Sequence, residues 1–446
     1  MQAIVLLPLL LTLAVGLKYG FREAFVYVCL PLFLLLPDYY RFKLPGIPEF
    51  TPWNYTFLAV FGALLLSEDR RHLRPHPLDL LPILFVYFCV RSEYDIKGWK
   101  DTQNLLANMT FGCILPYYLG KVMVRVPGLL TGALTMIGLV CACVGFVSIY
   151  EARMGTNPFD VWRNFWPVSV PFDGALYRSG IRRVQGPFSH PIFGGFIYSM
   201  VIPCLFWLRD RNALRGWKAR WLLVAGCVVG LLTTVSRGPM LGCLLTCGVM
   251  SLGWMRLRSV AVGVALLGAL VLPVLVGVQV QKFLSLDRAT ARTESEETAA
   301  YRKEMMENYW EVVMAEPIHG YGKNQVPVVK GQKSIDNMYL FTALQYGCPA
   351  ALTYVLLMGL PAALLFVRLL AVRSTHAYGR LGWVFVGMMG GSMFTQFTVV
   401  AGGQSLPLFF LLIGSSIGLS ARLGREHHGA SRPRRRAHLT PALAPA

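Results

Sequence analysis

The stretch GLLTGALTMIGLVCACVGFVSI, residues 128–149, decides the fold class. It contains 22 residues and no charged side chain. An α-helix of about 20 apolar residues crosses the hydrocarbon core of a bilayer and satisfies its own backbone hydrogen bonds. The stretch therefore predicts a membrane-spanning helix.

Similar apolar runs recur along the chain as far as residue 420. They are continuous and rich in Leu, Val and Gly, whereas barrel strands alternate over about ten residues. We therefore predict an all-α polytopic membrane protein with about 12–13 transmembrane helices. The 13 candidate spans are 2–17, 23–37, 52–66, 78–92, 103–120, 128–149, 190–208, 220–236, 238–254, 259–280, 338–367, 382–400 and 405–421.

The composition excludes the soluble and disordered classes. Of 446 residues, 55% are apolar and only 15% are charged, whereas a soluble domain has about 25% charged residues. So few charges cannot cover the surfaces of the three or so soluble domains that this length would form. Disorder requires low hydrophobicity.

The net charge of +19 comes mainly from the segments between the apolar runs and from the tail. Lys and Arg gather in every second short segment and in the tail, a pattern that places these segments in the cytoplasm and argues against a nucleic-acid partner. The tail is expected to contact anionic headgroups of membrane lipid. The predicted order is transmembrane helices 1–150, an outer loop 151–189, transmembrane helices 190–280, a large outer loop 281–337, transmembrane helices 338–421 and a basic cytoplasmic tail 422–446.

The large outer loop 281–337 is long enough to fold. Residues Tyr301, Met305, Tyr309 and Val312 recur on one helical face. We therefore predict an amphipathic helix near 298–314.

The first candidate site is RRVQGPFSHP, residues 182–191, which runs into an apolar span. Arg182 and Arg183 suit phosphate binding because guanidinium groups bind it in a bidentate manner and stay charged. His190 is a further candidate for substrate binding. The alternatives are an anchored loop end for the arginines and a helix cap for His190.

The second candidate site is SRGPML, residues 236–241. Arg237 is an isolated cation between two spans on the outer side, where the positive-inside rule disfavours it. Gly238 and Pro239 begin the next helix, whose open N-terminus favours an anion. We predict an anion ligand here; a snorkelling anchor is the alternative.

The third candidate site is IDNMYL, residues 335–340, at the end of the large loop. Asp336 is a carboxylate that is partly desolvated where the chain enters lipid, and it is a candidate general base. Asn337 follows as a candidate for substrate binding. The alternative for Asp336 is a helix N-cap.

The large loop holds further candidates for substrate binding. PIHGYGK, residues 317–323, has two glycines that suggest a tight loop with exposed amides. Its candidate side chains are His319, Tyr321 and Lys323, and Arg292 and Arg302 precede it.

Other chemistries have no motif in the sequence. GxxxxGK[ST], HExxH and paired Cys/His sets are absent, and no GxGxxG follows a strand. We therefore predict neither a metal nor a cofactor. Arginines and one carboxylate on the outer face suit an anionic lipid-linked substrate such as a diphosphate.

The order of these motifs resembles the O-antigen ligase and polymerase superfamily, whose members include WaaL-like ligases and Wzy-like polymerases. The resemblance covers about 165 residues. The matching segments are RxxGxxxHP at Arg183–Pro191, SRG with Rx3L at Arg237–Leu241, PxxGxG at Pro317–Gly322 and [H/D]NxYL…G at Asp336–Gly347.

The resemblance implies a GT-C-type glycosyltransferase. It would take an oligosaccharide from undecaprenyl diphosphate on the periplasmic face of the bacterial inner membrane, without a metal or nucleotide sugar. Arg183 and Arg237 would hold the diphosphate, and residue 336 would activate the acceptor hydroxyl. It also implies a chain-length regulator and a flippase of the same pathway as partners.

Position 336 departs from the ligases, which commonly carry His there. Asp336 resembles relatives associated with exopolysaccharide polymerisation, and this favours a polymerase of O-antigen or exopolysaccharide repeats with inversion at the sugar. Two alternatives stay open. One is a ligase that transfers glycan to lipid A-core or another acceptor. The other is a transporter or flippase of lipid-linked oligosaccharide.

Overall fold

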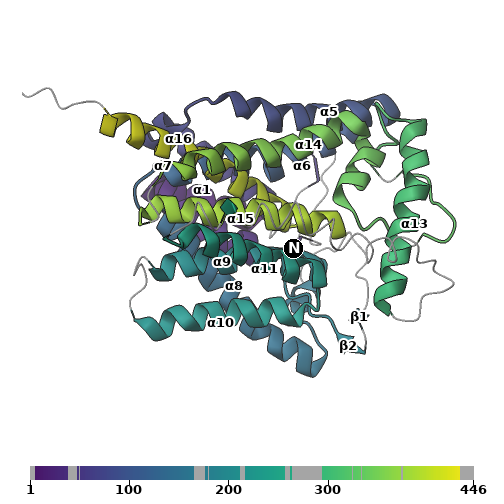
Figure 1. Cartoon of the computed structure of the whole chain (residues 1–446), viewed down its shortest axis with the longest axis horizontal. Helices are drawn as coiled ribbons and strands as arrows, with labels where there is room; N and C mark the ends of the chain where they lie inside the picture. The colour runs from purple at the N-terminus through teal and green to yellow at the C-terminus, as the bar shows by residue number, and fades with distance from the viewer. Residues whose placement is uncertain are drawn as a thin grey trace, which may run out of the picture.

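The chain forms a bundle of helices that run back and forth along one direction (Figure 1). The structure is a computed structural model. It describes residues 6–38, 48–49, 51–164, 176–178, 180–210, 216–256, 262–263, 294–323, 325–332, 334–372 and 375–431. Arg292, most of the candidate span 259–280 and most of the tail after residue 425 lie outside the described residues.

The described elements are mostly α-helices, with short 3-10 and π-helical segments (η) and one two-stranded hairpin. In chain order they are α1 (Leu7–Tyr19), α2 (Phe21–Glu23), η2 (Ala24–Cys29), α3 (Leu30–Leu35), α4 (Asn54–Leu66), η3 (Glu68–His72), η4 (Pro77–Asp79), α5 (Leu80–Lys97), α6 (Trp99–Met109), η5 (Thr110–Ile114), α7 (Leu115–Arg125), α8 (Leu129–Met154), η6 (Pro158–Asn164), β1 (Tyr177–Arg178), β2 (Ile181–Arg182), α9 (Pro191–Asp210), α10 (Trp217–Thr233), α11 (Arg237–Trp254), α13 (Glu294–Ala315), α14 (Met338–Leu370), α15 (Ala377–Thr398) and α16 (Ser405–Ser431).

Four of these helices are long and apolar enough to cross a membrane, which agrees with an all-α membrane protein. They are α8, α9, α14 and residues Ser405–Arg425 of α16. The apolar helices α1 and α4 are shorter. The count of 12–13 spans and the GT-C type stay predictions, as does the division of the chain into segments.

Two of the described helices contain a π-helical segment just before a proline. η2 precedes Pro31 between α2 and α3, and η5 precedes Pro116 between α6 and α7. Proline has no backbone N–H and its ring displaces the preceding turn. The widened π turn absorbs this break, so each helix continues across it.

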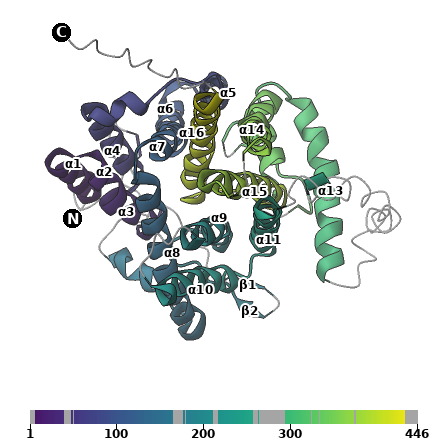
Figure 2. The same ribbon diagram turned by 60° about the vertical axis from the view of Figure 1, so that its left-hand side comes forward.

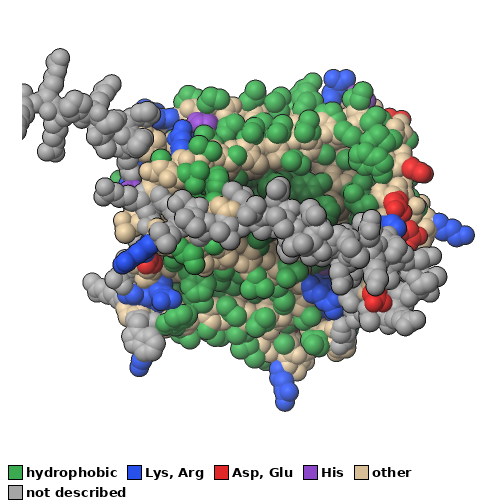
Figure 3. Space-filling view, in the orientation of Figure 1, with side chains coloured by type: hydrophobic (Ala, Val, Ile, Leu, Met, Phe, Trp, Pro, Cys, Tyr) green, Lys and Arg blue, Asp and Glu red, His purple; other side chains and the backbone are tan. Residues whose placement is uncertain are grey.

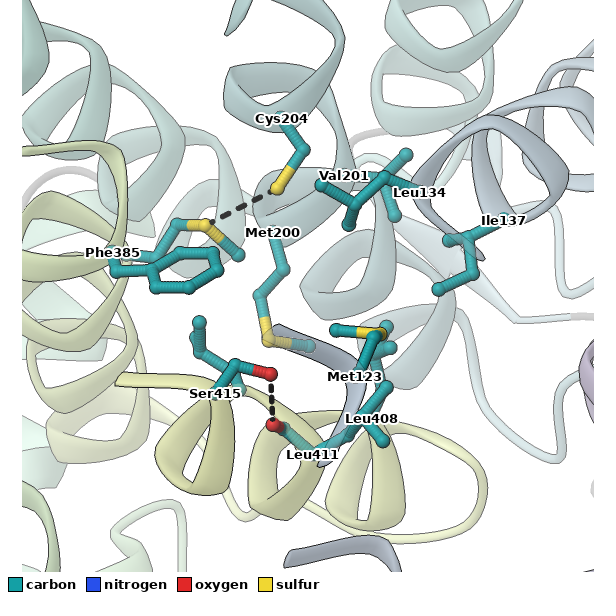
Figure 4. A pocket seen from close by; sticks show the side chains of 12 residues that line it. Met123, Leu134, Ile137, Met200, Val201, Cys204, Phe385, Leu408, Leu411 and Ser415 are labelled. Atoms are coloured by element: carbon teal, nitrogen blue, oxygen red, sulfur yellow. Dashed lines mark hydrogen bonds between the residues drawn. The ribbon is translucent and has the colours of Figure 1, made fainter. Parts of the chain in front are cut away.

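The centre of the bundle is apolar and closely packed. Viewed from the direction of Figure 2, α9, α15 and α16 lie at the centre. Figure 4 shows Met123, Leu134, Met200 and Phe385 around a cavity of about 30 Å³. Its walls are almost entirely apolar, so it belongs to the core and does not suit a sugar.

The two ends of the bundle differ in charge and in structure. Figure 3 shows hydrophobic side chains over the middle and most of the charged ones toward the ends. The hairpin and α13 lie at one end, called here the α13 end (Figure 1). At the opposite end, Arg125 donates to the carbonyl of His72 at 2.8 Å, and Arg422 donates to that of Val124 at 3.3 Å. Basic segments that the sequence predicted to share one side thus meet at one end.

The predicted amphipathic helix of the large loop is confirmed as α13. Met305, Tyr309 and Val313 are buried on one face of it, where they pack against Leu340 and Leu344 of α14. This contact holds α13 beside the first turns of α14, and it brings the large loop over the end of the bundle.

Candidate functional site

Arg183 lies over the junction between α10 and α11. The β-hairpin ends just before it, and its own N–H donates to the carbonyl of Leu176 at 2.8 Å. Its Nε donates to the carbonyl of Thr234 at 3.1 Å, and its Nη2 donates to Oγ of Ser236 at 2.8 Å. Two hydrogen bonds therefore fix the guanidinium beside the N-terminus of α11, and a third holds the backbone of Arg183.

A buried carboxylate holds the segment that follows Arg183. Glu151, near the end of α8, is 2% exposed and accepts the N–H groups of Gln185 and Gly186, each at 2.9 Å. Arg182 acts electrostatically on Glu151 and packs over Gly155. The two neighbouring arginines thus have different surroundings: Arg182 lies by α8 and Arg183 by α11.

Two further arginines approach from separate elements. Arg237, the first residue of α11, is exposed. Arg302 of α13 donates from Nη2 to the carbonyl of Thr398 at 3.2 Å. Its buried Nε has no hydrogen-bond partner among the described residues. A buried guanidinium N–H without a partner is costly, and a bound anion would satisfy it.

Asp336 is half-buried directly before α14. Ser334 donates from Oγ to one carboxylate oxygen at 2.9 Å, and the N–H of Asp336 faces the sulfur of Met305 at 3.3 Å. The N-cap of α14 is Asn337, whose Oδ1 accepts from Tyr339 and Leu340 at 2.9 and 3.0 Å. The alternative prediction of an N-cap at Asp336 is wrong, because the neighbouring amide does that work.

Electrostatic interactions link these groups across separate elements. Burial lowers the pKa of Arg183 to about 10, and Asp336 opposes that shift. Burial also lowers the pKa of Arg302; here too Asp336 opposes the shift, and Arg237 adds to it. We call Arg183, Arg237, Arg302 and Asp336 the arginine–aspartate cluster. It has three cations and one anion, and Arg183 stays protonated at pH 7.

The PIHGYGK segment lies elsewhere, against the end of α5. His319 contacts Asp95 at 3.2 Å, the Tyr321 hydroxyl donates to the carbonyl of Val312 at 3.0 Å, and the N–H of Lys323 donates to Glu93 at 2.7 Å. Among the described residues, no contact joins these three side chains to Asp336. Their role in substrate binding stays a prediction.

The glycines of this segment fit a kink in α14. Gly347 has φ +80°, and a Cβ there would lie 2.1 Å from the carbonyl oxygen of Ile318. The N–H of Cys348 donates to the carbonyl of Pro317 at 2.7 Å, and the N–H of Gly322 to that of Gln345 at 2.8 Å. Only glycine allows this close approach with a left-handed backbone. The motif thus fastens the large loop to α14.

His190 caps the entry to α9. Its Nδ1 accepts the N–H of Ile192 at 3.1 Å, and its ring lies 5.8 Å from that of Phe193. This agrees with the capping alternative and leaves its substrate role a prediction.

A cavity of about 340 Å³ is lined in part by the first turn of α14, which begins two residues after Asp336. Amide and aromatic side chains line part of it, including Asn54, Asn108, Gln345 and Trp53. Lys323 also faces it. Amides bind sugar hydroxyls and aromatic rings stack on sugar faces, so this amide-lined cavity has the chemistry for a carbohydrate.

Among the described residues, no group of three or more His, Cys, Asp or Glu side chains is placed to hold a metal ion. The cluster itself offers cations for an anionic group and a carboxylate that can accept a proton.

Sequence reasoning missed Glu151. A carboxylate near the end of a candidate span was the available signal, because buried acids near lipid are costly and usually have a specific partner.

Comparison with known proteins gives one family match. Residues 221–355 match the model of the family described as O-antigen ligase, a segment that contains Arg237, Arg302 and Asp336. No curated protein matches the chain. The match and the apolar helices point to a bacterial membrane protein. Residues 221–355 of the chain are thus similar to the O-antigen ligase family.

Proposed function

We propose that this protein is a membrane glycosyltransferase that joins lipid-linked glycan units. Its donor would be an oligosaccharide on undecaprenyl diphosphate, and its most favoured reaction is polymerisation of O-antigen or exopolysaccharide repeats. One observation carries the proposal: Arg183 and Arg302, from separate parts of the chain, interact electrostatically with the Asp336 carboxylate, and Arg302 also interacts with Arg237.

In this proposal, the arginines bind the diphosphate of the donor. Arg237 is exposed at the start of α11, and Arg302 presents a buried Nε that lacks a partner among the described residues. The leaving diphosphate gains negative charge in the transition state. Fixed guanidinium groups stabilise this charge more than they stabilise the ground state, so they accelerate the reaction.

Asp336 would act as the general base. Its carboxylate accepts the proton of the acceptor hydroxyl while the hydroxyl oxygen bonds to the anomeric carbon, and the bond from that carbon to the diphosphate breaks. A single displacement of this kind inverts the configuration. It needs no metal, because the arginines neutralise the leaving group.

The acceptor would be a sugar hydroxyl presented near the first turn of α14. The amide-lined cavity lies there and has room for a sugar. The carboxylate at position 336 favours polymerisation, whereas the description of the matching family favours a ligase. A lipid-linked oligosaccharide transporter is the alternative to both reactions, and it requires no base.

The location follows from the same proposal. The α13 end would face the periplasm and the opposite end the cytoplasm, in a multi-pass protein of the bacterial inner membrane with a GT-C-type arrangement. Substrate would reach the cluster from membrane lipid. A flippase and a chain-length regulator of the same pathway would be its partners.

The test compares Arg237→Ala and Asp336→Asn in the native host. Surface glycans and lipid-linked glycans are separated by size on a gel, and the membrane level of each variant is measured. Arg153→Ala and Asp101→Asn are matched controls, because both residues are exposed and belong to other helices, α8 and α6.

The pattern of glycans separates the reactions. Accumulation of single repeats with loss of long glycan supports a polymerase. Long glycan that persists on its lipid carrier and does not reach its acceptor supports a ligase. Wild-type glycan in both variants at normal protein level would refute the catalytic role and favour a transporter.

A further inference from the structure

A charged pocket lies at the end of the bundle opposite to the arginine–aspartate cluster. It has a volume of about 410 Å³, and four of its lining residues are Arg74, Arg125, Arg368 and Arg425. His76 also lines it, and none of the lining residues is acidic. We call this site the arginine pocket.

Four separate parts of the chain build the arginine pocket. Arg74 and His76 come from the connection between η3 and η4, Arg125 ends α7, Arg368 belongs to α14 and Arg425 to α16. A row of charges along one helix face needs only solvent around it. Here the charges come from four separate segments. The fold therefore brings four like charges to one concave place.

Local contacts hold two of these guanidinium groups in position. Arg125 donates from Nη1 to the carbonyls of His72 and Arg74 at 2.8 and 3.3 Å. Its buried Nε has no hydrogen-bond partner within the described part of the chain. Arg368 donates to the carbonyl of Ser420 and packs over Gly424, where a Cβ would lie 2.8 Å from its Nη1.

The nearest carboxylate does not neutralise the pocket. Asp79 is engaged by Lys121, whose Nζ lies 2.5 and 2.6 Å from its two oxygens, and by the Tyr117 hydroxyl at 2.6 Å. Burial lowers the pKa of His76, and Lys121, Arg368 and Arg125 lower it further, although Asp79 opposes them. The positive charge of the arginine pocket thus exceeds the negative charge near it.

The ring of His76 adds a donor. Its Nδ1 accepts the N–H of Leu78 at 3.2 Å. The neutral ring therefore carries its proton on Nε2, an assignment that follows from this hydrogen bond. Guanidinium groups together with an imidazole N–H are donors without acceptors, and this set matches the oxygens of a phosphate.

We propose that the arginine pocket binds a phosphate group at the end of the bundle opposite to the arginine–aspartate cluster. The group comes either from the headgroup of an anionic phospholipid or from a soluble phosphate compound. Exposed apolar side chains flank Arg368 on α14: Val367 is 64% exposed and Leu370 is 48% exposed. Acyl chains can lie on this surface while the headgroup phosphate occupies the pocket.

The test uses the full-length protein in detergent. Native mass spectrometry compares retention of phosphatidylglycerol with that of phosphatidylcholine from mixed micelles. Thermal unfolding with sodium pyrophosphate, at matched ionic strength, tests a soluble source. The variant Arg74→Gln/Arg425→Gln removes two charges from the pocket, and Arg70→Gln/Arg71→Gln removes two exposed charges nearby that do not line it.

The expected result is preferential retention of phosphatidylglycerol by the wild type. The pocket variant should bind it at least about tenfold more weakly, because each lost guanidinium removes a charge-assisted hydrogen bond. The Arg70/Arg71 variant should bind as the wild type does. Stabilisation by pyrophosphate, lost in the pocket variant, would instead identify a soluble phosphate as the source.

Two results would overturn the proposal. One is a wild type that shows neither preference for phosphatidylglycerol nor stabilisation by pyrophosphate, and this measurement does not depend on the folding of any variant. The other is equal weakening by both double variants, which would show that general surface charge attracts the lipid. Thermal unfolding without ligand checks that each variant is folded.

Discussion

The hydrogen bonds between Glu151 and the segment after Arg183 predict that Glu151 holds Arg183 in position. In Glu151→Gln the side chain keeps its size and loses its charge. The carboxylate accepts two N–H groups at 2.9 Å, from Gln185 and Gly186. A glutamine carbonyl can keep one of them, while its amide faces the other donor.

The size of the expected effect of Glu151→Gln follows from these two hydrogen bonds. A hydrogen bond to a charged group contributes about 1.5–3 kcal/mol net, so losing one of the two weakens this local structure by about that amount. Arg183 lies two residues before Gln185, and a shift of about 1 Å in a binding group can lower turnover by about 10²-fold. We therefore expect Glu151→Gln to lower turnover by about 10–100-fold.

The assay measures glycan transfer by purified protein from a lipid diphosphate-linked oligosaccharide, together with thermal unfolding. Glu307→Gln is the matched control, because that side chain is 65% exposed on α13. Wild-type turnover in folded Glu151→Gln would refute the inference that this carboxylate positions Arg183. Equal loss in Glu307→Gln would show that the assay responds to any removed carboxylate.

Three further predictions concern single contacts. Arg302→Gln should weaken binding of the glycan donor by about tenfold or more, because in the proposed function a charged hydrogen-bond donor to the diphosphate is lost; titration with the glycan donor measures this, and unchanged affinity would contradict it. Gly347→Ala should destabilise the fold by more than about 1 kcal/mol, because its backbone is left-handed and a Cβ would meet Ile318; an unchanged unfolding midpoint would oppose this. The hydrogen bond from Arg22 lowers the pKa of Asp69, so its stabilisation is present above the ordinary carboxylate pKa and is lost as the pH falls through the lowered value. Thermal unfolding between pH 6 and 3 should thus show a steeper loss in the wild type than in Asp69→Asn, and parallel curves would refute the coupling.

The sequence predicted the helical membrane class and the three motifs at one end of the bundle. A helix that crosses a bilayer needs a long apolar run, and such a run is visible in the sequence. The helices α8, α9 and α14 could therefore be predicted as candidate spans. Isolated charges beside such runs also stand out, and this singled out Arg237 and Asp336. Their gathering with Arg302 depends on how α13 packs on α14, which no local pattern encodes.

Other features depended on contacts between distant segments. The sequence could not show that Asn337 rather than Asp336 caps α14, since both residue types suit an N-cap. It also could not show that His319 lies against α5, because 224 positions separate it from Asp95. The π-helical segments escaped prediction as well, although Pro31 and Pro116 were available as signals.

Single-turnover transfer by purified Asp336→Asn, with donor binding measured on the same sample, tests the central claim most directly. The claim predicts transfer reduced by about 10²–10⁴-fold with donor affinity retained, since the arginines are unchanged. Transfer at the wild-type rate by a folded Asp336→Asn protein would contradict the assignment of this carboxylate as the base.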